Sequence, residues 1–195
     1  MNQLSPLLTA MAGLYAAENR EGGHQAARAL LAAALIEADL PEQPAGPLAE
    51  DLHLLLATDP HPLSALVRGA LPWLVWIYSE MGGRIRQTIA SGMMQTELVG
   101  PDGIFPHDGV RVGLWLQSAG LDYVTRAHAA EETFVILGGH ALWSMNHGPA
   151  VRQEAGAVIH HPSLTPHSDC TTNDPLLAAW RWSGDISIEQ YALKG

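Results

Sequence analysis

Short apolar runs separated by turn residues fill the chain from about residue 95 onward. The runs cover residues 110–116, 133–137, 141–145, 157–160 and 176–182, and glycine, proline, aspartate and asparagine lie between them. Runs of this length and spacing are typical of β-strands. Because many short strands in succession favour an antiparallel sandwich or barrel, residues 95–195 are predicted to form a β-barrel.

Residues 1 to about 82 have a helical period instead. Apolar side chains recur at helical spacing from Leu4 to Tyr15, and residues 26–38 are rich in alanine and leucine. Further helices are expected over residues 48–57 and from Ser64 through Tyr78, and glycines at 82 and 83 end the pattern. The chain is thus predicted to be mainly β, with a helical N-terminal segment over residues 1–94 and a barrel over residues 95–195. The helices either pack on the barrel or form the surface of a homodimer.

The composition is that of a folded chain with few charges, since 47% of the residues are apolar and 15% are charged. The formal net charge of −10 repels phosphate backbones, so nucleic acid is not expected as a partner. No apolar run approaches the roughly 20 residues of a membrane-spanning helix, so no membrane association is expected. The single cysteine, Cys170, and the lack of a basic stretch ahead of the first apolar residues favour a reducing, cytoplasmic location.

Three residues of the strand-rich half form a candidate metal site: His128, Glu132 and His167. Side chains alternate between the two faces of a strand, so residues 126, 128, 132 and 134 share one face if the strand continues. His128 and Glu132 are then expected to point into the barrel, and His167 to reach them from a strand on the opposite side. Two imidazoles and a carboxylate leave open positions on one divalent transition metal, which suits Fe, Mn, Ni, Co or Zn.

The spacing of these residues resembles the first motif of the cupin family, G-x5-H-x-H-x3-E-x6-G. Every spacing matches, and one residue type departs, because an arginine stands where the first histidine is usual. The matching residues are Gly120, Arg126, His128, Glu132 and Gly139.

A second cupin motif, G-x5-P-x-G-x2-H-x3-N, lies about 35 residues further along the chain. Three of its positions match, at Gly156, Pro162 and His167. Leu164 and Thr171 replace the second glycine and the asparagine. Together the two motifs imply a cupin double-stranded β-helix, which is a jelly-roll barrel, behind the helical segment.

The chain resembles one cupin group in particular, the bacterial dimethylsulfoniopropionate (DMSP) lyases and their lyase-like relatives. The resemblance covers most of the chain, including the helical segment, and rests on residues 110–114, 123, 128–132, 138–139, 162–167 and 175–185. It implies a metal-dependent lyase that converts DMSP to dimethyl sulfide and acrylate by β-elimination. In such a lyase the metal holds the substrate carboxylate, and a tyrosine removes the adjacent proton.

Two positions depart from this family pattern. The family has a tyrosine two residues after the metal-binding glutamate, and here that residue is Phe134, which can neither bind a metal nor take a proton. Arg126 replaces a histidine, and three roles are open to it: pointing away from the metal, pairing with Glu131, or holding a substrate carboxylate. Tyr123 matches another active-site tyrosine of the family and is the candidate catalytic residue.

Substrate contacts are expected from Arg126, Phe134 and Trp180, because a tryptophan face can bind a cationic sulfonium group. Of the adjacent His160 and His161, at most one can face the site, since neighbouring residues of a strand point to opposite faces. The two departures keep other activities open. One is a lyase-like cupin that acts on a small carboxylate as an isomerase or dioxygenase, and the other is a non-catalytic cupin that binds a small molecule.

Overall fold

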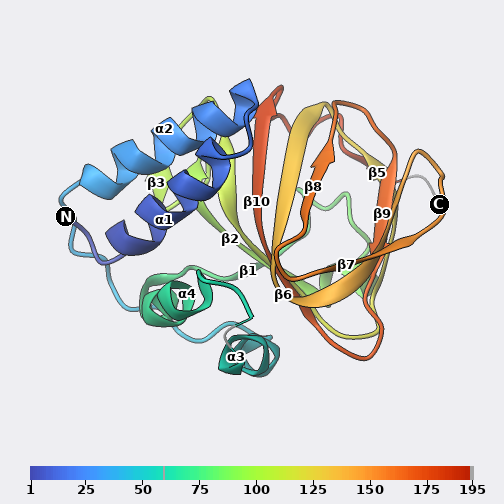
Figure 1. Ribbon diagram of the computed structural model, residues 1–195, viewed down its shortest axis with the longest axis horizontal. Helices are drawn as coiled ribbons and strands as arrows, with labels where there is room; N and C mark the ends of the chain where they lie inside the picture. Colours follow the sequence, from blue (N-terminus) through green and yellow to red (C-terminus); the bar gives the residue numbers. More distant parts are fainter. Residues whose placement is uncertain (59, 194–195) are drawn as a thin grey trace.

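Most helices come before the strands in the computed structural model, which describes residues 1–58 and 60–193 (Figure 1). The helices are α1 (Ser5–Ala16), α2 (Glu21–Leu35), α3 (Ala49–Ala57), α4 (Ser64–Ala70), the short 3-10 helix η1 (Leu71–Trp73) and α5 (Gln87–Ala90). The strands are β1 (Ile77–Tyr78), β2 (Met93–Gly100), β3 (Phe105–Pro106), β4 (Arg111–Gln117), β5 (Asp122–Ala127), β6 (Ala130–Met145), β7 (Val151–Glu154), β8 (Val158–His161), β9 (His167–Cys170), β10 (Leu176–Gly184) and β11 (Ala192–Leu193). The predicted β-barrel behind a helical segment is confirmed.

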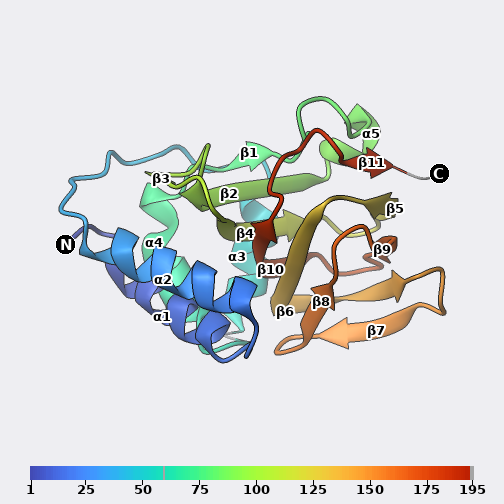
Figure 2. The ribbon, with the colours of Figure 1, turned by 90° about the horizontal axis from the view of Figure 1, so that it is seen from above.

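The strands form one bent sheet in the order β1-β2-β4-β10-β6-β9-β5-β11, with β3 on β2 and with β7 and β8 on β6 (Figures 1 and 2). The long strand β6 joins the two sides of the barrel, because its first half pairs with β10 and β8 and its second half with β7 and β9. It bends at Gly139, whose φ is +74° and where a Cβ atom would lie 1.9 Å from the carbonyl oxygen of Pro175. Only glycine fits this position without displacing the backbone.

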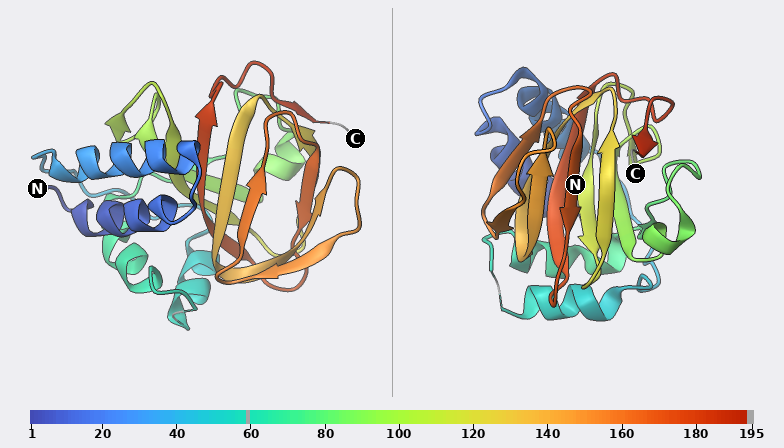
Figure 3. Two further views of the ribbon diagram at one scale, coloured as in Figure 1. Left: turned by 45° about the horizontal axis from the view of Figure 1, so that its top comes forward. Right: turned by 90° about the vertical axis from the view of Figure 1, so that its right-hand side faces the viewer.

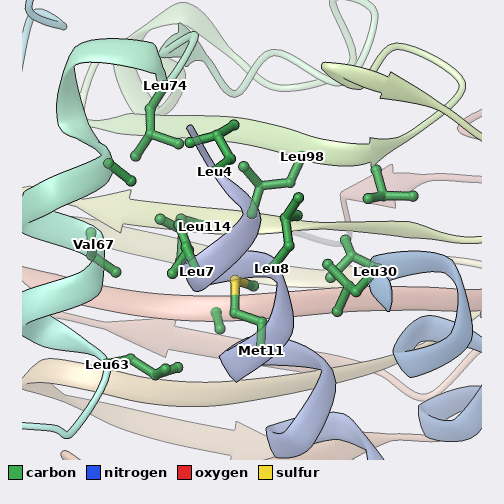
Figure 4. Packing of buried hydrophobic residues seen from close by; sticks show 14 of the residues in the cluster. Leu4, Leu7, Leu8, Met11, Leu30, Leu63, Val67, Leu74, Leu98 and Leu114 are labelled. Atoms are coloured by element: carbon green, nitrogen blue, oxygen red, sulfur yellow. The ribbon is translucent and has the colours of Figure 1, made fainter. Parts of the chain in front are cut away.

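Helices α1 to α4 cover the outer face of the sheet (Figures 1 and 3). One face of α1 and the inner side of α2 pack against β2, β4 and β10 in a cluster of aliphatic side chains (Figure 4). Labelled members of the cluster are Leu4, Leu7, Leu8, Met11, Leu30, Leu98 and Leu114. The apolar stripe of α1 is therefore buried against the barrel, which is the first of the two arrangements expected for the helices. A separate, aromatic-rich cluster fills the inside of the barrel.

The helix predicted from Ser64 through Tyr78 is wrong beyond Ala70. Pro72 has no N–H to donate to the preceding turn, so the helix tightens into η1 and ends. Leu74 is already extended, and Ile77 and Tyr78 pair with β2 opposite Gln95 and Met94. Two strands of the barrel thus begin within the segment 1–94.

The strand predictions were correct in position but incomplete. The two runs at 133–137 and 141–145 belong to the single strand β6, which continues through the bend at the two glycines. Strands β2, β3, β5, β7 and β11 are additional. Strand β5 contains Asp122, Thr125 and Arg126, whose polar side chains interrupt the apolar pattern. No helix of the described residues has the length and apolar character needed to cross a membrane.

Candidate metal centre

The two histidines and the glutamate predicted as ligands meet inside the barrel. His128 follows β5, Glu132 lies near the start of β6, and His167 begins β9. Glu132 Oε2 lies 3.4 Å from His128 Nε2 and 3.3 Å from His167 Nε2. All three side chains are buried, and their candidate ligand atoms lie within 4.8 Å of one another. The chain thus brings together three residues from elements far apart in sequence.

The hydrogen bonds of the two histidines leave their Nε2 lone pairs available. His128 Nδ1 lies 3.0 Å from the carbonyl oxygen of Ala130, and His167 Nδ1 lies 2.8 Å from that of Thr165. A carbonyl only accepts, so each Nδ1 carries a proton, and Nε2 is the ring nitrogen left to bind a metal. His167 Nε2 is buried without a hydrogen-bond partner. This is the tautomer that metal-binding histidines adopt, so the residues present fit a divalent metal.

Electrostatics keep His167 neutral. Burial lowers the pKa of His167 to about 3, and the nearby positive charge of Arg126 acts in the same direction. Glu132 is affected in the opposite way, since burial alone would raise its pKa. The neighbouring His128, His161 and His167 side chains outweigh burial and hold the pKa of the Glu132 carboxyl well below its usual range. A neutral imidazole beside a carboxylate is the protonation state that a metal ligand set requires.

Two side chains on neighbouring strands orient the Glu132 carboxylate. Trp182 on β10 and His161 on β8 lie directly opposite Glu132 in the sheet register, so all three side chains share the inner face. Trp182 Nε1 donates to Glu132 Oε1 at 2.6 Å, and His161 Nδ1 lies 2.8 Å from Glu132 Oε2. Because Trp143 Nε1 donates to His161 Nε2 at 3.0 Å, His161 carries its proton on Nδ1 and donates it to Glu132. Of the histidine pair, His161 therefore faces the site.

Arg126 pairs with Asp169 inside the barrel. Its Nη2 lies 2.7 Å from Asp169 Oδ1, although the contact lacks hydrogen-bond geometry, and both side chains are fully buried. Arg126 also lies over the Tyr123 ring, with Cζ 3.8 Å from the ring centroid. Burial alone would lower the pKa of Arg126, but the charge of Asp169 and smaller effects of nearby tyrosines and Glu132 together outweigh burial and raise the pKa. The guanidinium is thus already neutralised by a residue of the chain.

Glu131 is not the partner of Arg126, and that alternative is wrong. Glu131 accepts a hydrogen bond from Arg181 at 2.8 Å on the outer side of the sheet. Glu131 is the strand neighbour of the inward-facing Glu132, and neighbouring residues of a strand face opposite sides. Arg181 also binds Glu18. The carboxylates of Glu18 and Glu131, which lie near His160, are therefore held by a buried guanidinium, and this outer group is an ion-pair network rather than a cation site.

Replacing Asp169 with asparagine is expected to lower the free energy of unfolding by about 3–5 kcal/mol, because it leaves the buried charge of Arg126 uncompensated. Urea unfolding of the metal-free protein measures the change. Glu154→Gln is the control, since Glu154 forms an exposed pair with Arg152 at 2.7 Å and is expected to contribute less than about 1 kcal/mol. Equal losses in the two variants would contradict a buried, coupled pair.

A small cavity lies beside Glu132 at the centre of the barrel. Its volume is about 20 Å³, which is room for about one water molecule. Four predicted substrate or catalytic positions line it, together with residues that the sequence analysis did not assign to the site. The predicted positions are Tyr123, Arg126, Phe134 and Trp180, and the unassigned ones are Ser79, Met81, Gln95, Trp115, Trp182 and Tyr191. An outer cavity of about 440 Å³ shares Met81, Gln95, Trp180 and Trp182 with it, so the two cavities adjoin.

Two residues without a predicted role directly contact predicted ones: Asp169 pairs with Arg126, and Tyr191 contacts Tyr123. Asp169 shares strand parity with His167, a signal that the sequence contains. Tyr191, whose hydroxyl hydrogen-bonds that of Tyr123, lies in the C-terminal stretch and belongs to no motif. Tyr123 itself joins the site through an irregular register in β5, because Tyr123 pairs with Asp169 and Arg126 pairs with His167. Strand β5 thus has one more residue between these pairs than β9 has. The side chains of Tyr123 and Arg126 therefore both face inward, although residues an odd number apart would normally face opposite sides.

A bent jelly-roll sheet that buries a His–Glu–His set at its centre defines this protein as a cupin with a candidate metal centre. The chain belongs to the dimethylsulfoniopropionate lyase family, whose model matches residues 19–178. The family placement implied by the motifs is thus confirmed.

Individual relatives agree with this placement. The dimethylsulfoniopropionate lyase DddQ of Ruegeria pomeroyi is 32% identical over 111 residues, which are 57% of this chain and 55% of that protein. The chain thus matches about half the length of this curated relative. The crystal structure of DddQ from Ruegeria pomeroyi DSS-3 has a TM-score of 0.66 at 25% identity, covering 98% of this chain and 96% of that one. A chain from the crystal structures of the DMSP lyases RdDddP and RnDddQII has a TM-score of 0.64 at 26% identity, covering 98% of this chain and 100% of that one.

Proposed function

We propose that this protein is a metal-dependent carbon–sulfur lyase that cleaves DMSP, or a closely similar small carboxylate, by β-elimination. The observation that carries the proposal is the convergence of two imidazoles, each with Nδ1 bonded to a backbone carbonyl and Nε2 close to Glu132, on the Glu132 carboxylate. His128, Glu132 and His167 would hold Fe, Mn, Ni, Co or Zn in its divalent form. Family membership supports the reaction class.

The charges around the ligand set suit a carboxylate substrate. The charges of Arg126 and Asp169 cancel each other, and a histidine that binds a metal is neutral, so Glu132 leaves one net negative charge. A divalent cation would turn this into one net positive charge in a buried place, which favours a single carboxylate group. When bound, the metal supplies Lewis-acid stabilisation of the negative charge that develops on the substrate as its α-proton leaves.

Tyr123 is the proposed base. Its phenol lines the small cavity beside Glu132, and its ring is held by Arg126 on one face. As a phenolate it would take the proton from the carbon next to the carboxylate. The electrons of that C–H bond form the C=C bond of acrylate, and the electron pair of the C–S bond leaves with sulfur as dimethyl sulfide.

The outer cavity offers a place for the sulfonium end of the substrate. Trp180 and Trp182 form a wall common to both cavities, and an indole face attracts a cation. The lining of the outer cavity also includes the carboxylates of Glu80, Glu97 and Asp102 against the single guanidinium of Arg111. A molecule with a carboxylate at one end and a cation at the other matches the two adjoining cavities, with the carboxylate in the small cavity and the cation in the outer one.

Headspace detection of dimethyl sulfide tests the proposal. Protein loaded with each of the five divalent metals is expected to release dimethyl sulfide from DMSP with at least one of them, and chelation is expected to abolish the release. Phe134→Tyr, which restores the family residue, is expected to raise the rate. Background release from both proteins with every metal would contradict the DMSP reaction. Metal-dependent turnover of a different small carboxylate would then assign the site to that substrate, whereas tight binding without turnover would favour a non-catalytic cupin.

A further inference from the structure

We propose that Tyr191 is a positioning residue of the same reaction, which holds the Tyr123 phenol toward the metal ligands and supplies the second hydroxyl that Phe134 cannot. The proposal rests on the proposed function. It assigns a reaction role to the C-terminal stretch of the chain, residues 185–193, which carries no motif.

This C-terminal stretch crosses the barrel and is fixed at both ends. It leaves β10 at Gly184 and reaches β5 on the opposite side, where Ala192 and Leu193 of β11 pair with Ala127 and Arg126 (Figure 1). Near its start, Arg111 Nε donates to the carbonyl oxygen of Ile186 at 3.3 Å. Tyr191 immediately precedes β11, so the strand pairing determines where its side chain enters the barrel.

Aromatic neighbours fix the Tyr191 ring. It is stacked against the ring of His128 at 5.8 Å between centroids and 12° between planes, and against that of Trp182 at 6.4 Å and 24°. Its side chain is buried, with 5% of the residue exposed. His128 is a proposed metal ligand and Trp182 donates to Glu132, so Tyr191 packs directly on the groups that hold the site.

The hydroxyl of Tyr191 forms a hydrogen bond with that of Tyr123. When Tyr123 is a phenolate it can only accept, so the Tyr191 hydroxyl must then be the donor. A donor of this kind fixes the direction in which the phenolate lone pairs point. The proton removed from the substrate goes to Tyr123, and Tyr191 keeps its own proton throughout, so its contribution is orientation.

Phe134 contributes no hydroxyl to the cavity. Its ring lines the same small cavity as Tyr123 and Tyr191, and it lies 5.3 Å from Trp115 and 5.2 Å from Trp143 between centroids. In the family pattern a phenol stands at this position. The cavity of this chain therefore has two phenols after all, but the second one comes from the C-terminal stretch instead of β6.

Tyr191→Phe tests the proposal, because it removes the hydroxyl and keeps the stacked ring. We expect kcat for DMSP to fall about 10- to 100-fold, as for the loss of one hydrogen bond to a charged group. KM, metal content and melting temperature are expected to stay close to wild type. Phe134→Tyr is expected to raise kcat by a larger factor in this variant than in wild type, whereas a role of Tyr191 in packing alone predicts the same factor in both. Tyr15→Phe is the control, since Tyr15 is a buried tyrosine of α1 that packs between the helices and the sheet, outside the barrel cavity.

The outcomes separate this proposal from the proposed function. An active wild type with an unchanged kcat in Tyr191→Phe would overturn the positioning role alone. A fall in kcat matched by loss of metal or of melting temperature would overturn it too, because the residue would then act only on structure. A wild type that releases no dimethyl sulfide with any metal would refute the proposed function, and the reaction role of Tyr191 with it.

Discussion

His167→Ala is expected to lower the affinity for divalent metal by at least about 100-fold, since even residues that only orient metal ligands change it 10- to 100-fold. His167 Nε2 is buried, lacks a hydrogen-bond partner and lies 3.3 Å from Glu132 Oε2. Its removal leaves two ligands where three fit. Calorimetric titration of metal into the chelator-treated protein measures the affinity directly.

Melting temperature provides a second readout of the same variant. A metal that binds only the folded state stabilises it by mass action, so wild type is expected to melt higher with metal than without. In His167→Ala this difference is expected to disappear, and the metal-free melting temperature serves as the check on folding. His53→Ala is the matched control, because His53 lies exposed on α3, far from the ligand set in the sequence. Unchanged metal affinity in His167→Ala would contradict the assignment of the site.

The ligand set was predictable from sequence because its spacing matches the cupin motifs, although His128 lies between β5 and β6 and not on one continuous strand with Glu132. His128 and Glu132 are close in the chain, and the position of His167 follows from the second motif of the resemblance. The helices were predictable from their period in α1 and α2. The helix expected through Tyr78 failed because one proline outweighed a continuing apolar pattern.

The surroundings of the ligand set depend on register, which sequence patterns do not specify. The irregularity in β5 turns both Tyr123 and Arg126 inward, so the strict alternation that placed Arg126 correctly would have placed Tyr123 outside. Arg126 then meets Asp169 across the strand pair instead of Glu131. Tyr191 depends on a two-residue strand pairing at the far end of the chain, a signal too short for any pattern.

The Arg126–Asp169 pair would explain how a cation can occupy a ligand position beside the proposed metal. An isolated guanidinium would repel a divalent ion and lower its affinity. Here the burial of Asp169 raises the pKa of its carboxyl, and the charge of Arg126 counteracts this, so the two residues depend on each other. The pair thus fills the space of the usual histidine without changing the net charge of the site. It also removes Arg126 as a free partner for the substrate carboxylate, a role that passes to the proposed metal.

Tyr123→Phe is expected to lower kcat for DMSP by about 10²- to 10⁴-fold, the range that one positioned general base contributes. Burial raises the pKa of Tyr123 to about 12, although Arg126 and the Tyr191 hydrogen bond act against it. Only the phenolate can accept the substrate proton, so in wild type the rate is expected to rise with pH, about tenfold per unit, until Tyr123 ionises. A bound dication would lower the pH at which the rate stops rising. Below that pH the rate would still rise with pH.

The pH profile and metal binding together separate loss of the base from loss of the site. Tyr123→Phe is expected to keep its metal, because the phenol makes no contact with the three ligands among the interactions of the described residues. Its residual rate is expected to lose the alkaline rise, since the group that titrates is gone. Retention of the rise in the variant would show that another residue removes the proton. The Tyr123→Phe and Tyr191→Phe profiles differ for a physical reason: the first variant has no base, whereas the second has a base without its donor.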